Sequence, residues 1–201
     1  MNAVVWQAAS LLLEYPTDEL YARRPLLRAA VADLPAGEPA ARLAAFLDHL
    51  DAVPLGALAR DYVATFDLRR RCCLYLTYYR DGDTRRRGAS LVALKERYRA
   101  AGVEPATREL PDFLPVVLEF AALHGGADLL AEHRAGLELL RLALRDRSSP
   151  YAAPVEAVCA TLPGPAPRDR AEALRLARTG PPGELVGLEL GLRPFGPGGT
   201  A

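Results

Sequence analysis

Apolar residues recur along this chain at the spacing of an α-helix, and alternation with a period of two residues is nearly absent. Leu43, Phe46, Leu47 and Leu50, for example, fall at i, i+3, i+4 and i+7 and would line one face of a helix. Prolines, glycines and polar residues divide this pattern into segments of helical length. We therefore predict helices over residues 4–15, 17–34, 39–50, 54–66, 68–79, 88–101, 111–121, 126–147 and 150–162.

Many helices joined by short loops predict an all-α fold, a single-domain bundle of about nine to ten helices. With 201 residues, half of them apolar, the chain is long enough to bury a full core. We expect the helical domain to cover residues 1–162. Glycine and proline become frequent from Pro163 onwards, so residues 163–201 are expected to form an extension that is largely flexible, with a weak helix over 168–178.

Residues 66–122 hold the densest mixture of buried-type and polar side chains. The segment 68–79 is apolar nearly all round and predicts a central, buried helix. Three arginines, residues 85–87, stand at or just before the start of the next helix, where the backbone dipole disfavours cations. Either an internal carboxylate or a partner must offset them. Pro115 fits only near the start of its helix.

Charge and motifs exclude several classes of function. The 25 acidic and 25 basic residues balance, which argues against a general surface for nucleic acid or anionic membranes. On a helix, three successive arginines spread over about 200°, so Arg69–Arg71 and Arg85–Arg87 do not form one basic face. No nucleophile motif, phosphate-binding glycine loop or metal spacing is present, so we expect neither an enzyme nor a bound cofactor.

The three cysteines and three histidines also show no ligand spacing. We interpret the cysteines as small buried residues and the histidines as helix-surface or helix-end residues. No signal peptide pattern or apolar run of membrane-spanning length is present, so we expect a cytoplasmic protein that does not insert into the membrane.

Four runs in the centre of the chain carry a family resemblance. They are LYLTYY at 74–79, GDTRRRG at 82–88, ELPD at 109–112 and LPVVLEF at 114–120. Their order and spacing strongly resemble the NarJ family, dedicated chaperones of respiratory nitrate reductase within the wider TorD-like group. LLEYP at 12–16 and the segment from Tyr62 to Phe66-Asp67 match as well. Phe113 departs from the broader group, which often carries a histidine there, so no role can rest on that imidazole.

The resemblance implies a chaperone that catalyses no reaction. Such a chaperone binds the N-terminal segment of the catalytic, molybdenum-containing subunit of nitrate reductase, and it keeps that subunit competent for insertion of molybdenum cofactor and for membrane assembly. The bound segment looks like a twin-arginine signal or its remnant. Contacts with cofactor-delivery proteins are also expected. The alternative is a sister chaperone for a dimethyl sulfoxide or trimethylamine N-oxide reductase.

A peptide-binding chaperone needs an apolar groove and acidic residues that meet basic ones on its client. The alternative for each aromatic residue is core filling, and for Glu109 and Asp112 it is capping of the next helix. The candidate peptide-binding residues are Phe66, Asp67, Tyr78, Tyr79, Asp83, Arg87, Glu109, Asp112, Phe113 and Pro115.

Overall fold

The computed structural model describes residues 2–104 and 109–179, and within them eleven α-helices and no β-strand occur. The predicted all-α fold is confirmed. None of these described helices is long and apolar enough to cross a membrane. The helices are α1 (Asn2–Leu12), α2 (Asp18–Ala32), α3 (Glu38–Ala52), α4 (Leu55–Tyr62), α5 (Leu76–Asp81), α6 (Arg85–Ala100), α7 (Leu114–His124), α8 (Ala127–Glu132), α9 (Arg134–Arg145), α10 (Ala152–Cys159) and α11 (Arg170–Thr179).

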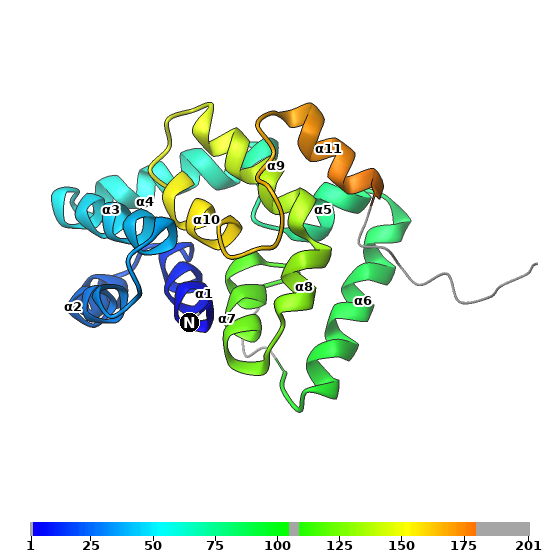
Figure 1. The fold of residues 1–201 in the computed structure, drawn as a ribbon, viewed down its shortest axis with the longest axis horizontal. Coiled ribbons are helices and arrows are strands. Elements are labelled where there is room, and N and C mark those ends of the chain that lie inside the picture. Colours follow the sequence, from blue (N-terminus) through cyan, green and yellow to red (C-terminus); the bar gives the residue numbers. More distant parts are fainter. Residues whose placement is uncertain (1, 105–108, 180–201) are drawn as a thin grey trace, which may run out of the picture.

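The helices pack in pairs around one core. Helix α1 lies along α7, α10 packs against both α3 and α9, and α11 covers α9. In Figure 1, α2 and α3 lie at one end of the molecule and α6 at the other, with α1, α7 and α8 between them. Helix α7 is apolar on nearly every side and is correspondingly buried. Where it begins, Ser10 Oγ of α1 donates a hydrogen bond of 2.8 Å to the carbonyl oxygen of Pro115.

Several helix ends lie where local sequence signals place them. Thr17 caps α2, since its hydroxyl accepts a hydrogen bond of 3.4 Å from the backbone nitrogen of Leu20. Gly102 follows α6 with a φ of 75°, the left-handed conformation that glycine adopts without strain. Pro115 lies in the first turn of α7, where its missing N–H leaves no hydrogen bond unmade.

The prediction of a single buried helix over residues 68–79 is wrong. Helix α4 continues into a π-helical turn, Val63–Asp67, and a 3-10 turn follows at Arg70–Cys72. Leu68, expected to be buried, is 72% exposed. The chain is then extended up to α5, and its backbone pairs with the segment before α7 through Leu76 N to Asp112 O (2.9 Å) and Leu114 N to Leu74 O (2.7 Å). These hydrogen bonds replace those of a helix, which no local pattern could reveal.

The helix predicted over residues 126–147 is divided in two. Helices α8 and α9 meet at His133, whose φ of −95° and ψ of 8° depart from helical values. His133 was expected on a helix surface or at a helix end; it lies at a helix end, where it is only 5% exposed. Because the break turns this residue inward, a polar ring enters the core.

Residues 163–170 are held against α9 by arginine side chains. Nη2 of Arg134 donates to the carbonyl oxygens of Gly164 (2.9 Å) and Pro165 (2.7 Å), and Nη2 of Arg141 donates to that of Pro167 (2.6 Å). Helix α11 lies within the predicted extension 163–201. The part of that extension beyond residue 179 lies outside the described residues.

Candidate functional site

A groove of about 890 Å³ opens beside helices α1 and α7. It draws on segments that are far apart in sequence: the end of α1, the π-helical turn, the extended stretch before α5, the end of α6 and the loop before α7. Its lining residues are Glu14, Tyr15, Tyr62, Phe66, Asp67, Leu74, Tyr75, Tyr98, Val103, Glu104, Glu109, Phe113, Val116, Glu119, Phe120, Leu123 and His124.

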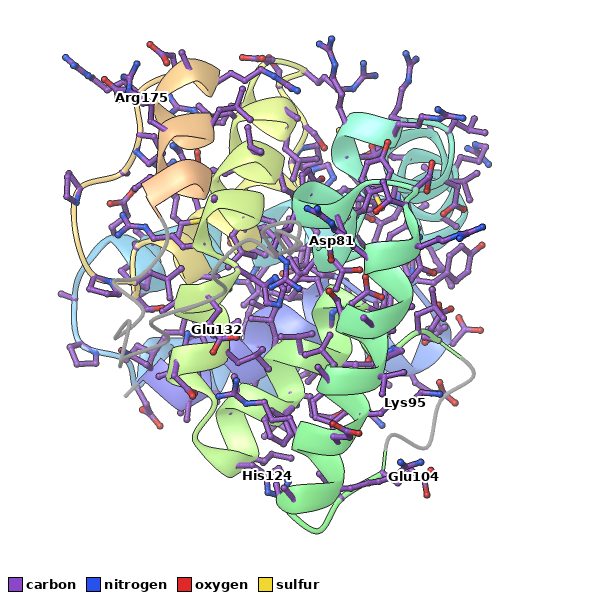
Figure 2. All side chains as sticks on the ribbon, turned by 90° about the vertical axis from the view of Figure 1, so that its right-hand side faces the viewer. Asp81, Lys95, Glu104, His124, Glu132 and Arg175 are labelled. Carbon is purple, nitrogen blue, oxygen red and sulfur yellow. The ribbon has the colours of Figure 1, made fainter. Side chains whose placement is uncertain are left out.

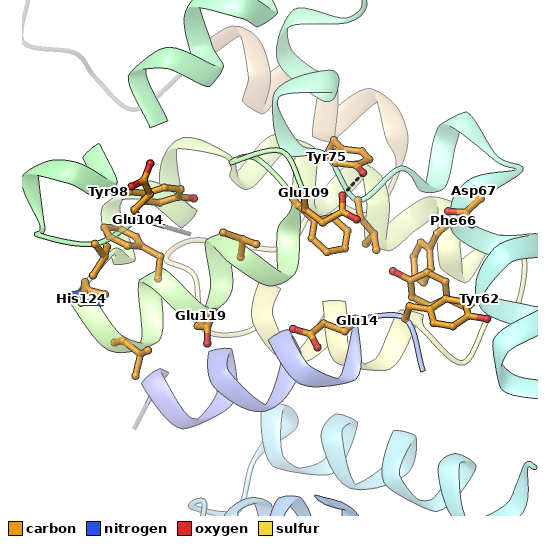
Figure 3. A pocket seen from close by; sticks show the side chains of 17 residues that line it. Glu14, Tyr62, Phe66, Asp67, Tyr75, Tyr98, Glu104, Glu109, Glu119 and His124 are labelled. Carbon is orange, nitrogen blue, oxygen red and sulfur yellow. Dashed lines mark hydrogen bonds between the residues drawn. The ribbon is translucent and has the colours of Figure 1, made fainter. Parts of the chain in front are cut away.

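The two ends of the groove are both aromatic. Figure 3 shows Tyr62 and Phe66 at one end, with Tyr98 and His124 at the other. The rings of Tyr62 and Phe66 lie 4.8 Å apart between centroids, so this end is a packed aromatic surface. At the far end, where α6 and α7 end, Glu104 and His124 project from the same part of the molecule (Figure 2).

Acidic side chains dominate the polar part of the groove. Five carboxylates line it: Glu14, Asp67, Glu104, Glu109 and Glu119. Neither lysine nor arginine occurs among the described lining residues. Burial raises the pKa of Glu14, and the nearby charge of Glu119 raises it further. Because carboxylates are the only charged side chains apart from His124 among the described lining residues, the groove favours a positively charged occupant.

Tyr75 joins the acidic and aromatic parts of the groove. Its hydroxyl donates a hydrogen bond of 2.7 Å to Oε2 of Glu109, drawn as the dashed line in Figure 3. Its ring lies 5.5 Å from that of Phe113 between centroids. Burial and the hydrogen bond to Glu109 raise the pKa of Tyr75, so the phenol remains a proton donor at neutral pH. The contact fixes Glu109 on one wall.

Asp112 lies behind this wall and is fully buried. Its Oδ2 accepts hydrogen bonds from the backbone nitrogen (3.2 Å) and the hydroxyl (2.5 Å) of Thr77 in the first turn of α5. The carboxylate therefore caps α5, a helix on another segment of the chain, and also faces the favourable end of the helix dipole.

Arg87 is the cation nearest to this buried carboxylate. Its Nη2 lies 3.6 Å from Oδ2 of Asp112, and its Nε donates a hydrogen bond of 3.2 Å to the Thr77 hydroxyl. Its guanidinium also lies over the ring of Tyr75, 5.7 Å from the centroid. The sequence required an anion to offset the arginines at the start of α6, and Asp112 is an internal anion that meets one of them.

The structure brings some of the sequence-predicted site residues together and separates others. Phe66, Asp67, Glu109 and Phe113 line the groove. The other six do not line it. Asp112 and Arg87 lie behind the wall, and Pro115 is buried under α1. Asp83 is exposed before α6, and Tyr78 and Tyr79 lie on α5.

Tyr79 has a structural environment of its own. Its hydroxyl donates to the carbonyl oxygen of Cys73 at 2.8 Å, and its side chain packs on Gly136 of α9. Contact between α5 and α9 therefore depends on this ring.

Sequence reasoning missed much of the groove lining. Tyr62 and Tyr15 lie in segments that already carried the family resemblance, so that match was the available signal. Glu119 was a second signal, because it is a charged residue in an otherwise apolar helical segment. Glu14 lies in the same matched segment as Tyr15, whereas Glu104 carried no comparable mark. In residues 2–104 and 109–179, no group of three or more metal-ligating side chains is positioned to hold a metal ion.

The profile of the family described as nitrate reductase delta subunit matches residues 31–157 of the chain. The chain belongs to this family. The resemblance to NarJ proteins seen in the sequence motifs is thereby confirmed.

Relatives in the nitrate reductase delta subunit family cover most of the chain. Identity to the nitrate reductase molybdenum cofactor assembly chaperone NarJ of Escherichia coli (strain K12) is 36% over 71% of this chain and 63% of that protein. NarJ of Bacillus subtilis (strain 168) is 31% identical over 79% of this chain and 88% of its own length. The nitrate reductase-like protein NarX of Mycobacterium tuberculosis is 46% identical over 79% of this chain. The chain spans only 24% of the length of that NarX protein.

A solved structure shares the fold. A protein from Archaeoglobus fulgidus described as a redox enzyme maturation protein superposes with a TM-score of 0.60, covering 79% of this chain and 91% of that one. Sequence identity is 22%, so the likeness concerns the fold alone.

Proposed function

We propose that the chain is a chaperone of nitrate reductase assembly. In this proposal it binds the N-terminal segment of the catalytic, molybdenum-containing subunit in the groove, and it holds that subunit competent for cofactor insertion and membrane assembly. One observation carries the proposal: a groove of about 890 Å³ joins aromatic ends to five carboxylates in a member of the nitrate reductase delta subunit family.

The groove chemistry suits an amphipathic, basic peptide. A helix with one apolar face would cover the rings of Phe66, Tyr62 and Phe113, because burial of aromatic surface supplies most of the affinity of such complexes. Lysine or arginine side chains at the border of that face would then meet Glu14, Glu119 or Glu109. Charge attraction would speed the encounter and select basic segments over acidic ones.

The names of the relatives support binding rather than catalysis. The two NarJ relatives are named as assembly chaperones, not as enzymes. A chaperone role requires no reacting group in the groove, only a surface that holds its client until assembly proceeds. This agrees with a groove whose polar side chains are mainly carboxylates.

Isothermal titration of the purified chain with a synthetic peptide tests the proposal. The peptide is the N-terminal segment of the catalytic nitrate reductase subunit from the same organism, and the matched control carries glutamine at each lysine and arginine position. We expect saturable binding of the first peptide and much weaker binding of the control. Equal affinity for both peptides would contradict the acidic recognition, and absence of binding to either would contradict the proposed site.

A second titration separates the two client classes. A twin-arginine signal peptide from a dimethyl sulfoxide or trimethylamine N-oxide reductase replaces the nitrate reductase peptide. Tighter binding of this peptide would assign the chain to the alternative client.

A further inference from the structure

A continuous line of polar contacts connects the buried carboxylate of Asp112 to the groove. Asp112 accepts a hydrogen bond from the Thr77 hydroxyl, which in turn accepts one from Nε of Arg87. The Arg87 guanidinium lies over the ring of Tyr75, and the Tyr75 hydroxyl donates to Glu109 on the groove wall. Four contacts therefore separate a fully buried charge from a carboxylate that faces a ligand.

Electrostatics explains why Arg87 lies inward. It occupies the first turn of α6, where the helix dipole disfavours a cation, yet only 22% of its side chain is exposed. A carboxylate that is fully buried, as Asp112 is, needs a nearby counter-charge or hydrogen bonds. Arg85 and Arg86 precede it on the same turn and are exposed. Of the three arginines, Arg87 is therefore the one that turns inward to Asp112, and this position places its guanidinium over the ring of Tyr75.

We infer that Arg87 and Asp112 are positioning residues for the groove: the buried carboxylate anchors the guanidinium, the guanidinium supports the ring of Tyr75, and Tyr75 fixes Glu109. This inference rests on the proposed function, because it assigns these residues an effect on ligand binding. Neither residue lines the groove, so we expect both to act on a ligand through Tyr75 and Glu109.

The physical gain is preorganisation of one wall. A glutamate side chain in solvent samples many rotamers, and ordering it on binding reduces affinity. Tyr75 holds the Glu109 carboxylate in one place before a ligand arrives. The Tyr75 ring is itself supported on two sides, by Arg87 at 5.7 Å and by Phe113 at 5.5 Å between ring centroids. Removing the guanidinium takes away one of these two supports of the ring.

A guanidinium is suited to this position because of its shape. Its planar fork carries several donors, so it can bond Thr77, face Asp112 and lie over an aromatic ring at once. A lysine ammonium carries the same charge at a single point. Lysine at position 87 should therefore compensate the charge of Asp112 without supporting Tyr75 in the same way.

A double-mutant cycle between Arg87→Gln and Glu109→Gln tests the inference, with affinity for the synthetic nitrate reductase peptide as the readout. We expect each single variant to weaken binding roughly fivefold and the double variant to be scarcely weaker than either, because contacting networks are not additive. Arg86→Gln, the exposed neighbour, is the matched control and should bind like wild type. The inference would be overturned if the double variant lost affinity by the product of the two single losses, or if Arg87→Gln bound the peptide like wild type. Wild type that fails to bind would instead count against the proposed function.

A measurement without peptide tests the same inference independently. Nuclear Overhauser contacts between the rings of Tyr75 and Phe113, in protein with labelled aromatic residues, report whether Tyr75 keeps its place. We expect these contacts in wild type and Arg86→Gln and expect them to weaken in Arg87→Gln. If Arg87→Gln fails to fold, Arg87→Lys replaces it, since lysine retains the charge beside Asp112. Ring contacts of wild-type strength in the folded Arg87 variant would overturn the positioning role, whatever the peptide does.

Discussion

Oδ2 of Asp112 lies 3.2 Å from the backbone nitrogen of Thr77 and 2.5 Å from its hydroxyl. The carboxylate thus caps a helix that precedes it in the chain by 35 positions. Capping was the alternative role considered for Asp112 in the sequence, but the expected partner was the helix that follows it. The loop before α7 and the start of α5 are consequently one unit, and Glu109 and Phe113 are carried on it.

We expect Asp112→Ala to lower the free energy of unfolding by about 3 kcal/mol, because it removes two buried hydrogen bonds and leaves Arg87 without its buried counter-charge. Asp112→Asn keeps an acceptor oxygen and should lower it by about 1–2 kcal/mol. Urea denaturation followed by circular dichroism measures both. Asp83→Asn is the control, because Asp83 also approaches Arg87, at 4.0 Å, but its side chain is 70% exposed. Equal effects of the variants at 112 and 83 would contradict the buried cap.

Two glycines in helices should respond oppositely to alanine. A Cβ at Gly136 would lie 3.0 Å from Cβ of Tyr79, so Gly136→Ala should push α9 away from α5 and lower stability by about 1–3 kcal/mol. A Cβ at Gly88 in α6 would meet nothing within 4 Å. Gly88→Ala should therefore raise stability by about 0.4–1 kcal/mol through the entropy of the unfolded chain. Thermal unfolding of both variants checks the pair, and destabilisation by Gly88→Ala would be inconsistent with an open site.

His133 should make stability depend on pH. Burial, followed by the nearby charge of Arg80, lowers its pKa from 6.5 to about 4. Between these two values the unfolded chain binds a proton that the folded chain does not, so stability should fall as pH falls from 6.5 to 4, by up to about 3 kcal/mol. Denaturation at several pH values measures this slope. His133→Gln should flatten it, and an unchanged slope in that variant would contradict this role of His133.

The acidic wall should make peptide binding sensitive to charge and salt. Glu119→Gln is expected to weaken binding of the basic peptide by about 0.5–1 kcal/mol, and added salt should weaken wild-type binding more than that of the variant. Titration calorimetry at two salt concentrations gives both quantities. Glu96→Gln is the control, since Glu96 is exposed on α6 and does not line the groove. Equal losses at positions 119 and 96 would point to net charge rather than to the groove.

Local sequence determined the helical class and most helix ends. The period of the apolar residues is set by burial of one face of each helix, and it does not depend on what that face meets. Thr17, Gly102 and Pro115 act through their own backbone preferences, so their effects could be predicted from neighbouring residues alone. The family motifs indicated the family, and several of them, at residues 12–16, 74–79 and 114–120, contribute residues to the groove lining.

Tertiary structure alone decided which side chains share the groove. Glu14 and Glu119 meet because α1 packs along α7, and Glu109 reaches Tyr75 because the two extended segments pair through backbone hydrogen bonds. The same pairing makes residues 73–75 extended despite their apolar pattern, because hydrogen bonds to a distant segment satisfy the backbone as well as helical ones do. It also buries Asp112 while leaving Glu109 exposed, although only three positions separate them. Sequence spacing reports neighbours along one element, whereas burial and charge pairing depend on the elements packed against it.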